Sequence, residues 1–210
     1  MVLLLPMESF PEDRGVLRVD LLRNGPISEF SSFLTNLENA FNHLFALEVI
    51  VTEAKHEADA NYGKKVRSLR SISKPEEIVF DLERLYLFRI RLTSPGWVDV
   101  FGKLNPLESL RQYLNDRHER KKDAAYRSKA EEDRLRLENE QLLYEIERIK
   151  TDVMKGKVQL LRDLGVSEHK IRQAITQHFL RPVEPLTQAQ DAGFVGGARM
   201  LLFEELEDRD

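Results

Sequence analysis

A proline-free stretch of mixed charge constrains this chain more than any other feature. No proline occurs at residues 107–181, and charges of both signs crowd residues 115–141. Opposite charges four residues apart, such as Glu132 and Arg136, each stabilise a helix by about 0.2–0.5 kcal/mol. A helix over 106–164 would be about 85 Å long, at about 1.5 Å per residue. The sequence therefore predicts a long charged helix that projects from a domain or pairs with another helix.

An apolar seam indicates where that helix pairs. Residues recur at alternating spacings of four and three in the series Leu135, Asn139, Leu142, Ile146, Ile149 and Val153. This is coiled-coil spacing, and Asn139 on the seam would fix the register, since facing Asn side chains hydrogen-bond only when aligned. The seam is shorter than the roughly three to four heptads typical of a coiled coil. We predict a homo-oligomer formed through these residues; the alternative is a helix that folds back on the N-terminal domain.

The first hundred residues have the pattern of an α/β domain, which we place at 14–104. Residues 16–22 alternate, which predicts a strand with Leu17 on the inner face and Arg18 on the outer face. Apolar residues at helical spacing then run from Phe30 to Phe45. They predict a helix that packs broadly on a sheet, with its phenylalanines in the core.

Four further segments complete the expected domain. Residues 47–51 are apolar and β-branched, which favours a second strand, whereas 76–84 fit either a strand or a helix. The clearest strand is 85–92, with Arg89 and Arg91 expected to face solvent. The pair Ser94-Pro95 then has the form of a helix start that Gly102 would interrupt.

Later signals divide the rest of the chain. Asn105-Pro106 predicts the start of the long helix, 105–164, and Gly165 its end. Beyond it, 165–210 is expected to hold a short helix that stops at Pro182. A flexible acidic tail containing Gly193–Gly197 should follow.

Composition excludes several function classes. The chain has 210 residues, 32% of them charged, no Cys and a net charge of −4. It therefore has no disulfide, no thiolate metal site and no cysteine nucleophile. The five His lack metal-site spacing, and no phosphate-binding glycine motif or marked acid–base pair occurs. We expect no enzyme activity, no metal and no cofactor.

Membrane and targeting signals are equally absent from the sequence. No apolar run approaches the about 20 residues of a membrane span, and Met1–Pro6 is too short for a signal-peptide core. The expected location is the cytoplasm, with no membrane attachment.

Two features favour an alternative, a DNA-binding regulator, although the net charge opposes binding through bulk charge. One is the basic cluster Lys64, Lys65, Arg67 and Arg70. The other is 160–178, in which a helix, a glycine turn and a second helix resemble a helix-turn-helix, with Lys170 and Arg172 as donors.

The segment from Leu85 to Lys122 carries a resemblance. It reads Leu-Tyr-Leu-Phe-Arg-Ile-Arg-Leu-Thr-Ser-Pro-Gly-Trp, then Phe-Gly-Lys-Leu-Asn-Pro-Leu-Glu, then Asp-Arg-His-Glu-Arg-Lys-Lys. This order resembles uncharacterised bacterial proteins that look related to the N-terminal domain of the tumour-necrosis-factor receptor adaptor TRADD. The likeness spans about 16–150 and is sharpest at Ser94-Pro95. The related proteins often have an apolar segment after the Ser-Pro; here Trp97–Phe101 is too short to enter a membrane.

That resemblance implies a small α/β sandwich with a ferredoxin-like sheet, used for protein contact in immune or conflict systems, and no enzyme activity. Together with the residue patterns, it predicts an α+β chain with a long charged helix and a short helical C-terminus. The expected function is a non-enzymatic interaction module that assembles through its helix and presents its α/β domain to an unidentified protein partner.

Overall fold

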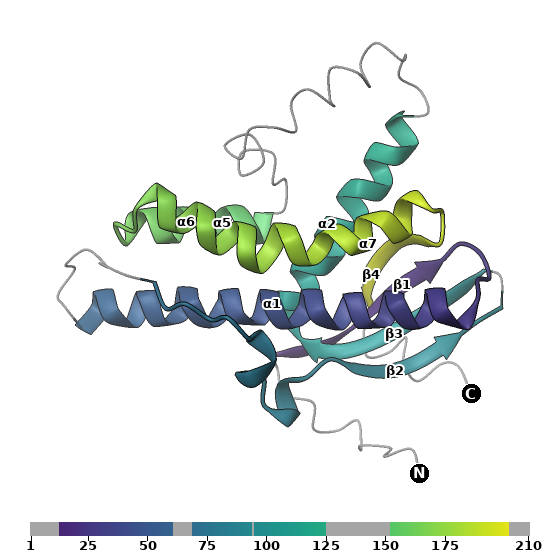
Figure 1. The fold of residues 1–210 in the computed structure, drawn as a ribbon, viewed down its shortest axis with the longest axis horizontal. Helices are drawn as coiled ribbons and strands as arrows, with labels where there is room; N and C mark the ends of the chain where they lie inside the picture. The colour runs from purple at the N-terminus through teal and green to yellow at the C-terminus, as the bar shows by residue number, and fades with distance from the viewer. Residues whose placement is uncertain (1–12, 61–68, 94, 125–151, 202–210) are drawn as a thin grey trace.

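A four-stranded antiparallel sheet with helices packed against it forms the fold, which confirms the predicted α+β class (Figure 1). The computed structural model describes residues 13–60, 69–93, 95–124 and 152–201. Its strands are β1 (Arg14–Leu21), β2 (Tyr86–Arg91), β3 (Gly96–Lys103) and β4 (Val195–Leu201). Its helices are α1 (Ile27–Ala60), α2 (Leu104–Ala124), α5 (Asp152–Asp163), α6 (Glu168–Ile175) and α7 (Arg181–Asp191), with short turns η2 (Pro75–Glu77) and η3 (Asp81–Glu83) and a π-helical turn η5 (Thr176–Leu180).

The strand order across the sheet is β2-β3-β1-β4. Two β–α–β crossovers build it, because α1 lies between β1 and β2, and α2 lies between β3 and β4. This is the split βαβ arrangement. The chain adds α5, α6 and α7 before β4, so its helical layer is larger than two crossovers require.

The core lies between one face of the sheet and α1. Leu17 and Val19 of β1 are fully buried with Phe41 of α1, as the alternation predicts. Gly102 of β3 permits this close approach, since a Cβ there would lie 2.9 Å from the Phe41 ring. The glycine expected to interrupt a helix is therefore the place where α1 meets the sheet.

Two elements expected near the domain's centre are different in the structure. The strand predicted at 47–51 is wrong, because α1 continues without a break to Ala60. Its buried residues Leu47, Ile50, Val51, Ala54 and Ala58 keep helical spacing, which outweighs local β propensity. The helix start predicted at Ser94-Pro95 is also wrong: Ser94 lies outside the described residues, and Gly96 opens β3, which pairs with β2.

The undecided segment 76–84 is neither strand nor α-helix. It holds the second and third residues of η2, then Ile78 and Val79 without regular structure, and then η3. The strand predicted at 85–92 is confirmed as β2.

A single straight helix over 106–164 is also wrong. The first part is confirmed, because α2 begins at Leu104, next to the predicted Asn105. However, α2 and α5 contact each other, and Met154 of α5 lies in the same buried cluster as Leu110 of α2. Ends of one straight helix cannot meet, so these segments are separate helices packed on a common core.

The C-terminal segment belongs to the same core rather than to a tail. Gly165 ends α5 with a φ of 76°, as predicted, but Pro182 lies in the first turn of α7 and does not stop the helical run. The predicted flexible tail at Gly193–Gly197 is wrong, because β4 begins at Val195 and pairs with β1. Propensity misses this strand because it is glycine-rich and its stability comes from β1 and the helices.

Candidate interaction surface

The most unusual surface of the described chain lies along β2. Eight large apolar side chains are exposed among the described residues, and six of them fall within residues 80–92. These six are Phe80 (74% exposed), Leu92 (58%), Leu87 (51%), Tyr86 (44%), Ile90 (38%) and Phe88 (37%). Apolar groups gathered in this way on a surface mark interaction sites. We call residues 80–92 the β2 surface.

The pairing of β2 with β3 decides which way these side chains face. Leu87 lies opposite Val100 and Ile90 lies opposite Val98, so both point to the helix-covered face. Tyr86, Arg89 and Arg91 point to the outer face, opposite Phe101, Asp99 and Trp97. The register shifts between Leu87 and Arg89, which places a bulge at Phe88. The strand is therefore at an edge, with apolar groups toward both faces.

The prediction that Arg89 and Arg91 face solvent is correct only for Arg91. Arg89 is half-buried, with its Nε 3.5 Å from Oδ2 of Asp99, and its guanidinium lies 5.1 Å from the Phe88 ring. Sequence alternation could not reveal this difference, because it depends on an acid on the neighbouring strand.

Asp99 is the buried charge that joins three strands. Its carboxylate accepts two hydrogen bonds from Arg18 of β1, from Nε and Nη2, both at 2.7 Å. The Asp99 side chain is 0% exposed and that of Arg18 is 7% exposed, and Arg18 also lies 4.0 Å above the Trp97 ring. Since Arg89 adds a second positive charge, this acid fixes how β1 and β2 sit on β3.

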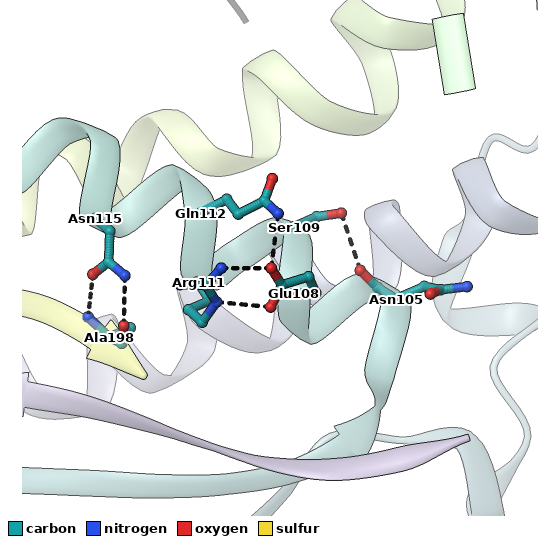
Figure 2. A network of polar contacts seen from close by, with 7 residues as sticks. All are labelled: Asn105, Glu108, Ser109, Arg111, Gln112, Asn115 and Ala198. Atoms are coloured by element: carbon teal, nitrogen blue, oxygen red, sulfur yellow. Dashed lines mark hydrogen bonds and ion pairs between the residues drawn. The ribbon is translucent and has the colours of Figure 1, made fainter. Parts of the chain in front are cut away.

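The opposite edge of the sheet is closed. Asn115 of α2 acts as an adjacent strand would: its Oδ1 accepts from the Ala198 N–H, and its Nδ2 donates to the Ala198 carbonyl, both at 2.7 Å (Figure 2). Buried Gln190 of α7 donates to the carbonyls of Gly196 and Leu114 at 2.9 Å. Helix side chains thus occupy the backbone groups of Ala198 and the carbonyl of Gly196, which another chain would need for pairing.

A second polar network of Figure 2 lies within α2 itself. Glu108 accepts two hydrogen bonds from Arg111, at 2.7 and 2.6 Å, and one from Gln112 at 2.7 Å (Figure 2). The bond from Arg111 lowers the pKa of the Glu108 carboxyl, and the same bond raises the pKa of Arg111. Both groups stay charged near neutral pH, so this ion pair stabilises the helix to which its members belong.

A second titratable pair lies inside the helical layer. Nδ1 of His43 on α1 is 3.3 Å from Nδ1 of His178 in η5. Burial lowers both pKa values, and the neighbouring His43 helps to lower that of His178 to about 4. At neutral pH both imidazoles are therefore uncharged, and the Nδ1–H of one ring donates to the Nδ1 of the other. Sequence spacing gave no sign of this pair, because its members are 135 residues apart.

The predicted site residues fall in different places. Of the seam, Leu135, Asn139, Leu142, Ile146 and Ile149 lie outside the described residues, and only Val153 is placed, half-buried on α5. Self-association through them stays a prediction. Of the basic cluster, Lys64, Lys65 and Arg67 also lie outside the described part, whereas Arg70 pairs with Glu53 at 2.6 Å.

The helix-turn-helix-like segment is part of the helical layer. Its second helix, α6, buries Ile171, Ala174 and Ile175 and runs directly into η5. Lys170 and Arg172 on this helix are both half-buried. Lys170 lies near Ile50 of α1, because both line one small cavity. The segment is thus packed into the helical layer and is not a separate three-helix unit.

In the described ranges, no three His, Asp or Glu side chains gather as metal ligands would. No helix within those ranges combines the length and the apolar character needed to cross a membrane.

A scan against models of protein families finds no match, and neither the curated proteins nor the solved structures contain one. The β2 surface is a candidate interaction site that the sequence did not reveal, since edge position and exposure are not visible in a single strand pattern.

Proposed function

We propose that this protein is a non-enzymatic interaction module that pairs with a second copy of itself along β2. The observation that carries the proposal is the gathering of exposed apolar side chains on one open strand, in contrast to the closed β4 edge. Unpaired edges are sites where another strand adds by main-chain hydrogen bonds.

The facing pattern of β2 favours a second copy as the occupant. The bulge places Leu87 and Ile90 on one face and Tyr86 and Arg91 on the other. The order of side chains on the two faces is therefore the same in either direction along the strand. In an antiparallel pair about a two-fold axis, Leu87 would lie opposite Ile90 of the partner copy, and Tyr86 opposite Arg91. Such pairs combine apolar groups and place a cation against an aromatic ring.

In this register the bulged Phe88 is left out of the ladder, so Arg89 lies opposite its own copy at the two-fold axis. Two facing guanidinium groups repel each other, and the buried Asp99 beside each Arg89 offsets this repulsion within each copy. The bulge also matters, because a bulged edge resists pairing with a regular strand. A second β2 carries the same bulge at the matching position, which favours self-pairing over pairing with an arbitrary strand.

The biological setting of the module comes from the resemblance. Bacterial relatives of the TRADD N-terminal domain imply contact with a further protein in a defence or signalling system, and a cytoplasmic location is part of this proposal. Two-fold pairing through β2 leaves the helical layer available for such a partner, because the helices that close β4 lie at the other edge of the sheet (Figure 1).

The double substitution Leu87→Lys with Ile90→Lys tests the proposal. Placed across the two-fold axis, four lysines would repel one another, so we expect the dimer mass measured by light scattering to fall to that of the monomer. Ile27→Lys is the matched control, because Ile27 is 87% exposed but lies at the start of α1. Leu142→Asp with Ile146→Asp tests the coiled-coil seam separately and should leave the β2 pair intact.

Cross-linking gives a second, geometric test. The chain contains no cysteine, and directly opposite residues of antiparallel strands have Cα atoms about 4.5–5.5 Å apart, which suits a disulfide. Tyr86→Cys with Arg91→Cys should therefore yield a covalent dimer on mild oxidation, whereas Ile27→Cys should not. A monomeric parent chain, or a dimer that survives the lysine substitutions, would overturn the proposal.

A further inference from the structure

A small cavity lies between the segment after α1 and the helical layer. Residues 69–71 form one wall, and α6 and η5 form the other. Its volume is about 130 Å³. Gln177 of η5 joins the two walls by donating to the carbonyl of Ile72 at 3.0 Å. The cavity is thus held by the fold and is not a gap between unconnected segments.

The polar lining of this cavity is cationic. Arg70 and Lys170 reach it from positions one hundred residues apart in the chain, and Ser71, Gln173, Gln177 and His178 supply further polar groups. None of its nine lining residues is acidic. Glu53, which accepts from Arg70 Nη1 at 2.6 Å, lies outside that lining. Two cations with hydroxyl and amide donors are the groups that bind an oxyanion.

Size restricts the ligand further. Sites for drug-sized molecules enclose about 300–1000 Å³, so a cavity of about 130 Å³ receives one compact group and not a whole nucleotide. A phosphate group meets both conditions, since it is small, carries up to two negative charges and presents several acceptor oxygens.

The histidine pair lies directly beside this cavity. His178 lines it from η5, and its Nδ1 contacts His43 of α1. Burial lowers the pKa of His43, and the charge of Glu76 in η2 acts in the opposite direction. An anion in the cavity would favour the protonated form of His178, so the pKa of this imidazole should rise when the cavity is occupied.

We propose that the cavity bounded by Arg70, Ser71, Lys170, Gln173 and Gln177 binds a single phosphate group. The phosphate belongs either to a small molecule or to a nucleic-acid backbone. The two basic segments that the sequence suggested as separate DNA contacts thus contribute one residue each to the same site. This site is independent of the β2 surface, because α6 and η5 do not belong to the sheet edge.

Calorimetric titration of the full-length chain with inorganic phosphate tests the site. We expect binding that weakens at least about tenfold in Lys170→Gln, because a charge-assisted hydrogen bond is lost. Lys155→Gln, which removes an exposed lysine of α5, is the matched control and should bind phosphate as the parent does. In the parent, the pKa of His178, followed by NMR, should rise when phosphate is added.

Two further arms identify the source of the phosphate. Titration with a nucleoside monophosphate and with a short duplex DNA should show whether either binds with the same Lys170→Gln sensitivity. A response to duplex DNA assigns the site to a nucleic-acid backbone, and a response to the small ligands alone assigns it to a small molecule. Absence of phosphate binding at millimolar concentration, or binding that Lys170→Gln leaves unchanged in a folded variant, would overturn the inference.

Discussion

The two edges of this sheet are treated in opposite ways. At the β4 edge, Asn115 and Gln190 reach from the helices and take up the backbone groups of Ala198 and Gly196. At the β2 edge, the apolar side chains of Leu87 and Ile90 are left exposed. Since an open edge invites pairing with another chain, this difference is the basis of the proposed pairing through β2.

The two edges also differ in what holds them to the rest of the sheet. β2 is attached through β3 and the buried Asp99, whose partners are Arg18 and Arg89. β4 is attached through β1 and through side chains of α2 and α7. Three changes should show that the β2 edge depends on the buried charges, whereas the β4 edge depends on the helices.

The largest effect is expected from Asp99→Ala. It leaves Arg18 buried without its carboxylate, and breaking a buried ion pair in this way costs about 3–5 kcal/mol. Urea unfolding should show this loss in the free energy of unfolding. Glu29→Ala, which removes the partially exposed partner of Arg23, is the control and should cost no more than about 1 kcal/mol. Similar losses in the two variants would show that Asp99 does not have the assigned role.

Acidification should destabilise the helical layer, to which His178 belongs. The pKa of His178 is lowered to about 4 in the folded chain, whereas an unfolded histidine titrates near about 6.5. The unfolded state therefore takes up the proton first, so stability is complete above about pH 6.5 and declines as the pH falls toward 4. By linkage, about 2 kcal/mol is lost between pH 7 and pH 5.

Hydrogen exchange is the measurement that locates this acid effect. Protection in η5 and α7 should decline before that of β2 and β3, because His178 belongs to the helical layer. His178→Gln removes the titrating group and should flatten the pH dependence of stability over the same range. An unchanged profile in that variant would rule out the histidine contact as its origin.

The smallest effect is expected from Asn115→Ala. It removes two hydrogen bonds to Ala198 at the β4 edge, and water can replace part of them, so the expected cost is about 1–2 kcal/mol. The sharper readout is hydrogen exchange at the Ala198 amide, which should speed up. Protection along β2 should not change, and a loss there would mean that the two edges are not independent.

Local patterns predicted much of the fold. Alternation located β1 and β2, helical spacing located α1, and Gly165 marked the end of α5. The failures share one cause. Residues 47–51 have strand propensity but continue α1, and the glycine-rich segment from Val195 becomes β4, because packing against distant residues outweighed local preference.

The candidate sites were less predictable than the fold. Arg70 and Lys170 were identified as basic residues in separate segments, but nothing in the sequence indicated that they line one cavity. Exposure of Leu87 and Ile90 was also hidden, since a strand pattern does not reveal whether the strand lies at an edge or in the centre. The expected pairing residues 135–149 lie outside the described chain.

By itself, the sequence determined the α+β class, the start of the helix after β3 and the exclusion of thiol chemistry, because these depend on composition and on neighbours within a few residues. Only the tertiary structure decided that β4 completes the sheet, that His43 meets His178, and that one edge is closed while the other is open. Each of these depends on contacts between segments far apart in the chain, and such contacts leave no periodic signal in either segment.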